Sequence, residues 1–183
     1  MTTTTTYTVS SEGATVGNND TTTLNGAIRA VESGPVGNYV IDITGTINLT
    51  SQLLAINLPA GSTLTIQGTN GSGDPQVQTL DGGGTERGLF VYAGTVDIGD
   101  LAINDMVTQG GSGSVGGGGG AGLGGGLFVG ANVAGDVGNV TLTDVTFAGD
   151  KAVGGAGSTS RNSGSVGGGG GGGLAGDGGG TGN

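Results

Sequence analysis

The residues in this chain that could carry out chemistry are mostly aspartates. Those of interest lie in or beside a repeated stretch in the middle of the sequence: Asp97, Asp100, Asp105, Asp144 and Asp150. Carboxylates can act as general acids and bases, or ligate Ca²⁺, when several of them converge. The chain contains no histidine and no cysteine, so the commonest general base and the usual zinc ligands are missing. A carboxylate site is therefore the chemistry that these residue types leave open.

Asp100 and Asp144 are the strongest pair among these carboxylates. They occupy equivalent positions in two copies of the repeat, TVDIGDLAIND and NVTLTDVTFAGD. If the copies stack as neighbouring strands, the two side chains lie about 5 Å apart and could hold Ca²⁺. The alternative is that both are turn residues that bond to nearby backbone N–H groups. Neither of these two stretches contains an arginine or a lysine, so we favour the turn over a catalytic pair.

The composition excludes several other classes of function. Of 183 residues 48 are glycine, and 14 acidic residues oppose 4 basic ones, for a net charge of −10. The basic residues are scattered along the sequence, so they cannot form the positive patch that nucleic acid or an anionic membrane requires. No apolar run approaches the roughly 18 residues of a membrane-spanning helix. We therefore expect no nucleic-acid partner and no embedded membrane segment.

One helix is expected near the start of the chain. Residues 1–21 are predicted to form a tail and a first strand, and residues 22–35 to form the helix. The apolar residues of this helix recur at i, i+3, i+4 and i+7 and share one face: Leu24, Ala27, Ile28 and Val31. Thr23 or its neighbour can cap the start, and Gly34 ends the helix before a proline.

The rest of the chain consists of short alternating strands that repeat. The segment 95–111 superposes on 139–155, and GLFVYA (88–93) superposes on GLFVGA (126–131). A weaker copy, TLTIQG, precedes them. The strands stay alike while the spacers change length, which is typical of a solenoid. We predict an all-β fold, a right-handed parallel β-helix whose coils span residues 36–157.

This fold predicts which side chains lie next to one another. Val96 should lie beside Val140 within the core, and the apolar helix face should cover the first coil, because a solenoid end exposes apolar side chains and unpaired backbone. Thr65, Asp97 and Thr141 should form an outward row. An uninterrupted threonine row on a β-helix could bind ice, but Asp97 breaks this one.

Two glycine tracts interrupt or follow the coils. We predict that residues 109–126 form a lateral insertion, and that residues 158–183 form a second glycine-rich loop that stops before a further coil. SGSVGGGGG at 112–120 recurs at 163–171. Such tracts could be solvated loops, or binding surfaces whose backbone groups pair with another strand or glycine tract. Apolar residues at matching places in the two tracts favour packing: Val115, Leu123, Val166 and Leu174.

The motifs resemble those of a known group of proteins. LNGAIRAVESGPVGNYVIDITGTINLTSQL is similar to the capping helix and first coil of large bacterial surface proteins, and the repeats resemble the pectate-lyase-like coils of autotransporter passengers and related adhesins. The GGAI and FxxN elements of polymorphic outer-membrane proteins also have counterparts, at 125–128 and 147–150, with aspartate in place of asparagine in the second. The resemblance covers about residues 22–157.

The resemblance implies a non-enzymatic, exported protein of the bacterial cell surface. Its β-helix would be a stalk or adhesin segment that binds another copy of itself, or a glycan or protein of a host or other surface. Two alternatives stay open: a self-assembling filament subunit, and a fragment of a β-helical polysaccharide lyase or hydrolase. Ca²⁺ at Asp100 and Asp144 is the one cofactor that the sequence suggests.

Overall fold

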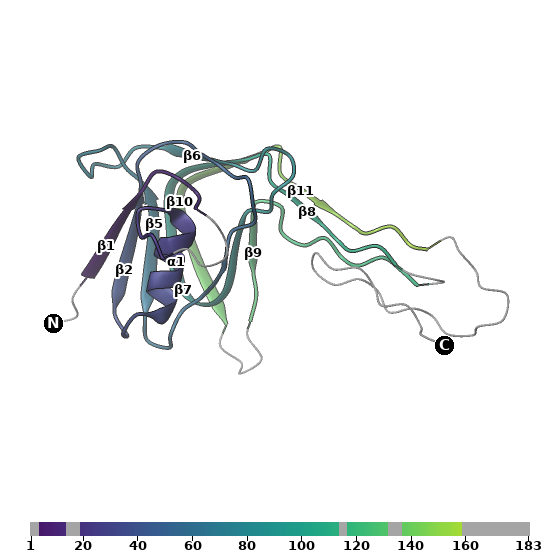
Figure 1. Ribbon diagram of the computed structural model, residues 1–183, viewed down its shortest axis with the longest axis horizontal. Helices are drawn as coiled ribbons and strands as arrows, with labels where there is room; N and C mark the ends of the chain where they lie inside the picture. Colours follow the sequence, from purple (N-terminus) through teal and green to yellow (C-terminus); the bar gives the residue numbers. More distant parts are fainter. Residues whose placement is uncertain (1–3, 14–18, 114–116, 132–136, 159–183) are drawn as a thin grey trace.

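The computed structural model describes residues 4–13, 19–113, 117–131 and 137–158 of the chain. Within them the protein is mostly β, with one short helix. Figure 1 shows a body of roughly parallel strands from which a long arm projects. A nine-stranded sheet makes up the body, and a separate two-stranded sheet begins the arm. All pairs of named strands are parallel.

The described residues form one helix, close to the N-terminus, and a series of strands. In chain order they are β1 (Thr4–Val9), α1 (Leu24–Ser33), β2 (Asn38–Ile43), β3 (Ile47–Asn48), β4 (Ala55–Asn57), β5 (Thr63–Gly68), β6 (Gln78–Asp81), β7 (Leu89–Asn104), β8 (Val107–Gln109), β9 (Leu127–Val129), β10 (Gly138–Ala148) and β11 (Lys151–Val153).

Strand β7 organises the sheet because its 16 residues form three successive segments. The first segment pairs with β4 and β9, the second with β5 and β10, and the third with β6 and β10. Gly94 and Asp100 separate the segments, and both have positive φ, 101° and 51°. The sequence predicts two separate strands here, at 88–93 and 95–105. They form one strand instead, because the bends at Gly94 and Asp100 barely interrupt the pairing with the neighbouring strands.

The pairing follows the register expected from the repeats. Val96 pairs with Val140, and Leu64 of the weaker copy pairs with Val96 from the other side. The GLFV copies also lie in register, with Leu89 opposite Leu127. The predicted neighbours are therefore confirmed, over a sheet that is parallel as predicted.

Alternate side chains of these strands build a single apolar core. Ile41, Ile66 and Ile98 occupy successive strands at the same register and are at most 1% exposed. Each such side chain contributes about 1.5–3 kcal/mol by leaving water. Leu142 is next in the same row and is 44% exposed, since no described strand covers β10 beyond β7. The row therefore ends in an uncovered apolar edge.

Helix α1 packs against the first strands, as its apolar face predicts. All four apolar residues of that face are fully buried, and the helix contacts β1, β2 and β4. The Thr23 hydroxyl accepts a hydrogen bond from the Gly26 N–H and caps the helix start. Gly26 would weaken an isolated helix by about 1 kcal/mol relative to alanine, but a Cβ there would lie 2.0 Å from the Asp20 carbonyl oxygen. Close packing therefore requires this glycine.

A buried carboxylate ties the N-terminal segment to the following strands. Glu12 is 6% exposed and accepts hydrogen bonds from the backbone N–H groups of Thr50 and Ser51, at 2.7 and 2.9 Å, and from both hydroxyls. Four donors around one carboxylate satisfy its buried charge. Glu12 is thus a structural residue.

Some boundaries differ from the prediction. Strand β1, expected within residues 1–21, starts at Thr4, because its backbone pairs with β2 although its side chains are mostly exposed. Strands β8 and β11 were not expected as separate elements. No described helix is long and apolar enough to cross a membrane.

Candidate functional site

Asp100 and Asp144 lie at the same bend in adjacent strands. Each falls between paired neighbours, Gly99 with Thr143 and Leu101 with Val145. Their φ values are 51° and 53°, a left-handed conformation that aspartate tolerates better than most residues. This geometry supports the turn interpretation of both. Within the described ranges, no group of three or more acidic, histidine or cysteine side chains is placed to hold a metal ion, so Ca²⁺ at this pair stays a prediction.

The remaining aspartates of the repeat are dispersed. Asp97 is exposed on the outer side of β7, in register with Thr65 and Thr141, so the predicted outward row is confirmed. Asp150 precedes β11, and its Oδ1 accepts a 2.7 Å hydrogen bond from the Met106 N–H. Its Oδ2 is buried without a hydrogen bond. Burial, followed by the nearby Asp105 carboxylate, raises the pKa of Asp150.

The raised pKa of Asp150 predicts a pH dependence of stability. Because the folded state holds the proton more tightly than the unfolded state, stability falls as the pH rises from the unfolded pKa, about 3.9, through the folded pKa. In Asp150→Asn an amide oxygen can still accept from Met106 while the charge is absent. We expect this variant to lose less stability than the wild type over that interval, in urea denaturation at a series of pH values. Identical profiles would contradict the expectation.

A cluster of aromatic side chains lies on the outer side of β7 and β9. The Phe90 ring meets Phe128 edge to face at 5.1 Å between centroids, and Tyr92 at 5.9 Å. The chain has only 6 aromatic residues, 3 phenylalanines and 3 tyrosines, so half of them gather here. The cluster arises because the repeated GLFV motif places phenylalanines opposite each other in register. Sequence reasoning missed it, although the paired motif was its signal.

Arg87 adds a positive charge beside this cluster. Its guanidinium carbon is 5.2 Å from the centre of the Phe90 ring, which is cation–π distance. Its Nη2 donates a 2.9 Å hydrogen bond to the Leu53 carbonyl. Burial lowers the pKa of Arg87, but arginine stays charged in proteins at neutral pH. The aromatic–arginine cluster, defined as Arg87, Phe90, Tyr92 and Phe128, thus combines apolar faces with a fixed cation.

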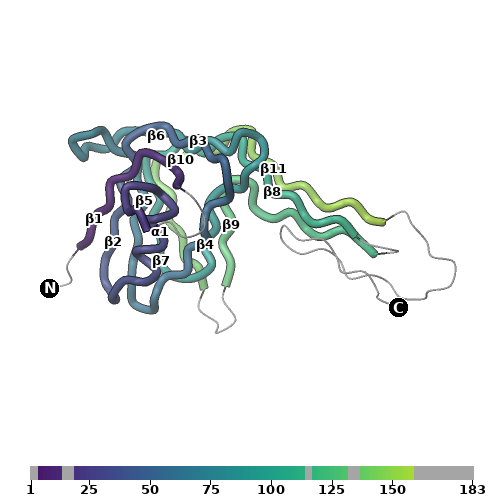
Figure 2. The backbone as a smooth tube through the Cα atoms, in the orientation of Figure 1, coloured from purple at the N-terminus to yellow at the C-terminus, as the bar shows by residue number. Residues whose placement is uncertain are grey.

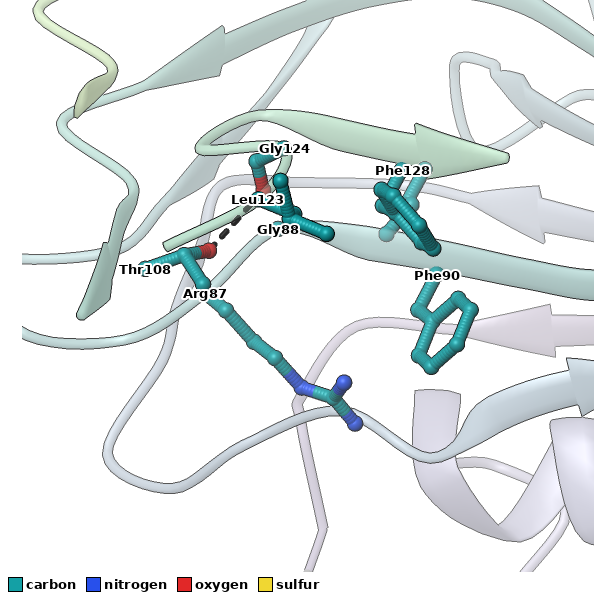
Figure 3. A pocket seen from close by; sticks show the side chains of 8 residues that line it. Arg87, Gly88, Phe90, Thr108, Leu123, Gly124 and Phe128 are labelled. Carbon is teal, nitrogen blue, oxygen red and sulfur yellow. Dashed lines mark hydrogen bonds between the residues drawn. The ribbon is translucent and has the colours of Figure 1, made fainter. Parts of the chain in front are cut away.

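A small crevice opens beside the aromatic–arginine cluster (Figure 3). Its volume is about 20 Å³, room for roughly one water-sized group. Leu123 and Gly124 form one wall, and the Gly124 carbonyl accepts a 2.9 Å hydrogen bond from the Thr108 hydroxyl. The crevice therefore joins the cluster to the base of the projecting arm.

That arm consists of three extended segments, each of which contains at least three glycines. We call residues 107–113, 117–126 and 151–158 together the glycine arm, shown projecting from the body in Figures 1 and 2. The first strand accepts a hydrogen bond from Gly120 at the Gly111 carbonyl, 2.7 Å. This first strand, 107–113, also donates to the third strand, 151–158. The third strand in turn donates to the second, 117–126. Every strand of the arm therefore bonds to both others.

The hydrogen bonds in the arm recur every three residues. Gly110 and Gly113 donate to Val153 and Ala156. On the other side, Gly155 and Ser158 donate to Gly120 and Gly117, each pair again three residues apart.

A parallel β ladder has a period of two in side-chain direction, whereas an extended threefold helix of the polyproline II type has three residues per turn. The spacing is thus that of a bundle of such extended glycine helices.

Glycine is required inside this bundle because the backbones touch. A Cβ on Gly155 would lie 1.9 Å from the Gly111 carbonyl oxygen, and one on Gly119 would lie 1.9 Å from the Gly155 carbonyl oxygen. No side chain fits at such distances. The described residues of the predicted lateral insertion at 109–126 pack through backbone contacts. Val115, Val166 and Leu174 lie outside the described residues, and Leu123 is 40% exposed.

Comparisons with known proteins add no assignment. No family model, no curated protein and no solved structure matches this chain. The function must therefore be argued from the geometry described above.

Proposed function

We propose that this chain is a segment of an exported bacterial surface protein, in which a right-handed parallel β-helix serves as a stalk for adhesion or self-association. The register of the strands is the observation that carries the proposal. Tyr39, Leu64, Val96 and Val140 follow one another in adjacent parallel strands. A chain that returns to the same register after each pass extends along one axis, since every pass contacts only its neighbours.

The arrangement suits a mechanical role. Backbone hydrogen bonds and rows of buried side chains both run along the axis of stacking, so pulling on such a rod loads many interactions together. Three rows of described strands share this axis. The first segment of β7 lies between β4 and β9, the second between β5 and β10, and the third between β6 and β10. A stalk of this kind places attached surfaces at a fixed distance from its anchor.

The aromatic–arginine cluster is the surface best suited to adhesion. Aromatic and arginine side chains are enriched among the residues that dominate binding energy at interfaces. Three aromatic rings beside a cation offer stacking faces and a donor to a glycan or protein partner. The surrounding protein is strongly acidic, which makes a fixed cation on this face a distinguishing feature for a partner.

Labelling of intact cells tests the surface assignment. Antibodies against the chain are applied to cells that produce the protein, before and after permeabilisation, and protease is added to intact cells in parallel. We expect labelling and cleavage without permeabilisation. Labelling that requires permeabilisation would contradict export.

An adhesion assay tests the aromatic–arginine cluster. Beads coated with purified protein are bound to host cells and to glycan surfaces, and Phe128→Ala is compared with Phe147→Ala, an exposed phenylalanine of β10 outside the cluster. Loss of a central aromatic residue costs about 2 kcal/mol at an interface, so Phe128→Ala should lower binding about 30-fold while Phe147→Ala changes it little. Equal effects of the two substitutions would contradict an adhesive role for the cluster.

A second candidate, a filament subunit, is favoured by the uncovered edge of the last strands. Four apolar side chains there are 41–44% exposed: Val129, Leu142, Phe147 and Val153. An apolar strand edge is a template for pairing with another chain. Electron microscopy of the purified protein at rising concentration tests this candidate, which predicts fibres one subunit wide. Particles of constant length would contradict it.

A further inference from the structure

The glycine arm has three outward edges that differ in their side chains. The first strand exposes Gln109 and Ser112, three residues apart. The second exposes Gly118 and Ala121 at the same spacing, and the third exposes Gly154 and Gly157 at that spacing, with the exposed Ala156 between them. Only the edge of the third strand consists of glycine at both positions. We call it the glycine edge.

Packing inside the arm does not account for the two glycines of this edge. A Cβ on Gly154 would lie 3.9 Å from the nearest other atom, and one on Gly157 would lie 3.8 Å away, both ordinary contact distances. Neither residue has the positive φ that would favour glycine. Glycine loses more entropy on folding than alanine, by roughly 0.5–1 kcal/mol. Contacts among the described residues therefore do not require glycine at either position.

Among the described residues, the backbone at this edge is not paired. The buried side of the third strand donates through Gly155 and Ser158, whereas no hydrogen bond joins the backbone of Gly154 or Gly157, three residues apart, to another described residue. Only a chain that also lacks side chains at that spacing can approach closely enough to bond with both.

We propose that the glycine edge pairs with the glycine edge of a second copy of this chain, antiparallel, about a twofold axis. Identical surfaces form a closed contact under such symmetry. The arm already contains the required geometry, because its second and third strands run antiparallel and are joined by hydrogen bonds of 2.8 and 3.0 Å, from Gly155 to Gly120 and from Ser158 to Gly117. A second copy would repeat this pairing on the opposite side of the third strand.

The distribution of charge favours a copy of the chain as the partner. The protein has a net charge of −10, yet none of its 14 acidic residues lies in the glycine arm, whose only charge is Lys151 at its base. Two copies therefore meet least like-charge repulsion when they approach through their arms. The proposal names a surface for self-association and does not depend on cell-surface export, which is measured separately.

Sedimentation velocity of the full chain at a series of concentrations tests the proposal. We compare Gly157→Val, which places a branched side chain on the glycine edge, with Gly118→Val, which places the same side chain on the edge of the second strand, where the space is also open. The wild type and Gly118→Val should form dimers with equal dissociation constants. Gly157→Val should raise the dissociation constant at least tenfold, with an unchanged circular dichroism spectrum and melting temperature.

Two outcomes would overturn the proposal: a wild-type chain that stays monomeric, and an equal loss of dimer in both variants. If the wild type is monomeric and Gly171→Val in the full chain forms dimers, the edge is occupied by the chain's own downstream glycine tract. Amide hydrogen exchange at Gly154 and Gly157, slower in the dimer than in the monomer, supplies a readout that a change in folding alone would not give.

Discussion

Replacing Ile98 with alanine is expected to lower the free energy of unfolding by about 2–5 kcal/mol, the usual cost of truncating a buried isoleucine. Ile98 is 1% exposed and lies in the middle of a row, between Ile66 on one side and Leu142 on the other. The strands on both sides are held by hydrogen bonds, so the cavity cannot close by local collapse. Denaturation in urea, with the slope and midpoint fitted together, measures the change.

Leu142→Ala is the matched control for this prediction. Leu142 occupies the same row one strand later but is 44% exposed, so its side chain gives up much less contact with water on folding. We expect a cost below about 1 kcal/mol. If Leu142→Ala destabilises the purified chain as much as Ile98→Ala does, the last strands are covered in solution and the edge is not free.

Gly155→Ala is expected to disrupt the glycine arm while leaving the body folded. A Cβ at this position would overlap the Gly111 carbonyl oxygen at 1.9 Å, and backbone cannot give way as a flexible side chain can. Overpacking of this kind costs about 1–3 kcal/mol, which corresponds to roughly 5- to 150-fold faster exchange of the amides that the arm protects. Hydrogen exchange by NMR at Gly110, Gly113 and Ser158 measures the effect.

Gly154→Ala provides the comparison for this second prediction. Its added methyl group meets nothing closer than 3.9 Å within the arm. Gly154 is also the residue next to Gly155, so both substitutions change the same strand. Exchange at the same amides should stay within about twofold of the wild type. An arm that tolerates both alanines equally would show that its strands are not in backbone contact, and the threefold packing would then be wrong.

Much of the fold could be predicted from the repeats and from one helix. The superposition of Val96 on Val140 predicts a register that the parallel pairing reproduces, because a strand that shifts by one residue would turn all its buried side chains outward. The apolar face of α1 and its Thr23 cap were equally readable, because the period of a helix and the chemistry of its start are local properties.

The candidate sites were much less predictable. The outward position of Asp97 could be predicted from the repeat, but the hydrogen bond that Asp150 accepts from Met106 could not, because it joins two residues that only the folded chain brings together. The aromatic–arginine cluster needed Phe90 and Phe128 to be neighbours in space and Arg87 to fold back over a ring. The repeated GLFV motif signalled the first of these contacts, but no pattern in the sequence signalled the position of the Arg87 guanidinium over the Phe90 ring.

The alternation of apolar residues, the repeat register and the position of the helix could all be predicted, since each follows from spacings along the chain. The role of the glycines became apparent only in the folded protein. A residue without a side chain has no pattern of its own, and the same tract could be a solvated loop or a packed strand. Gly155 and Gly154 differ only in what lies next to them, a carbonyl oxygen at 1.9 Å or open space, and that difference exists only once three distant segments have come together.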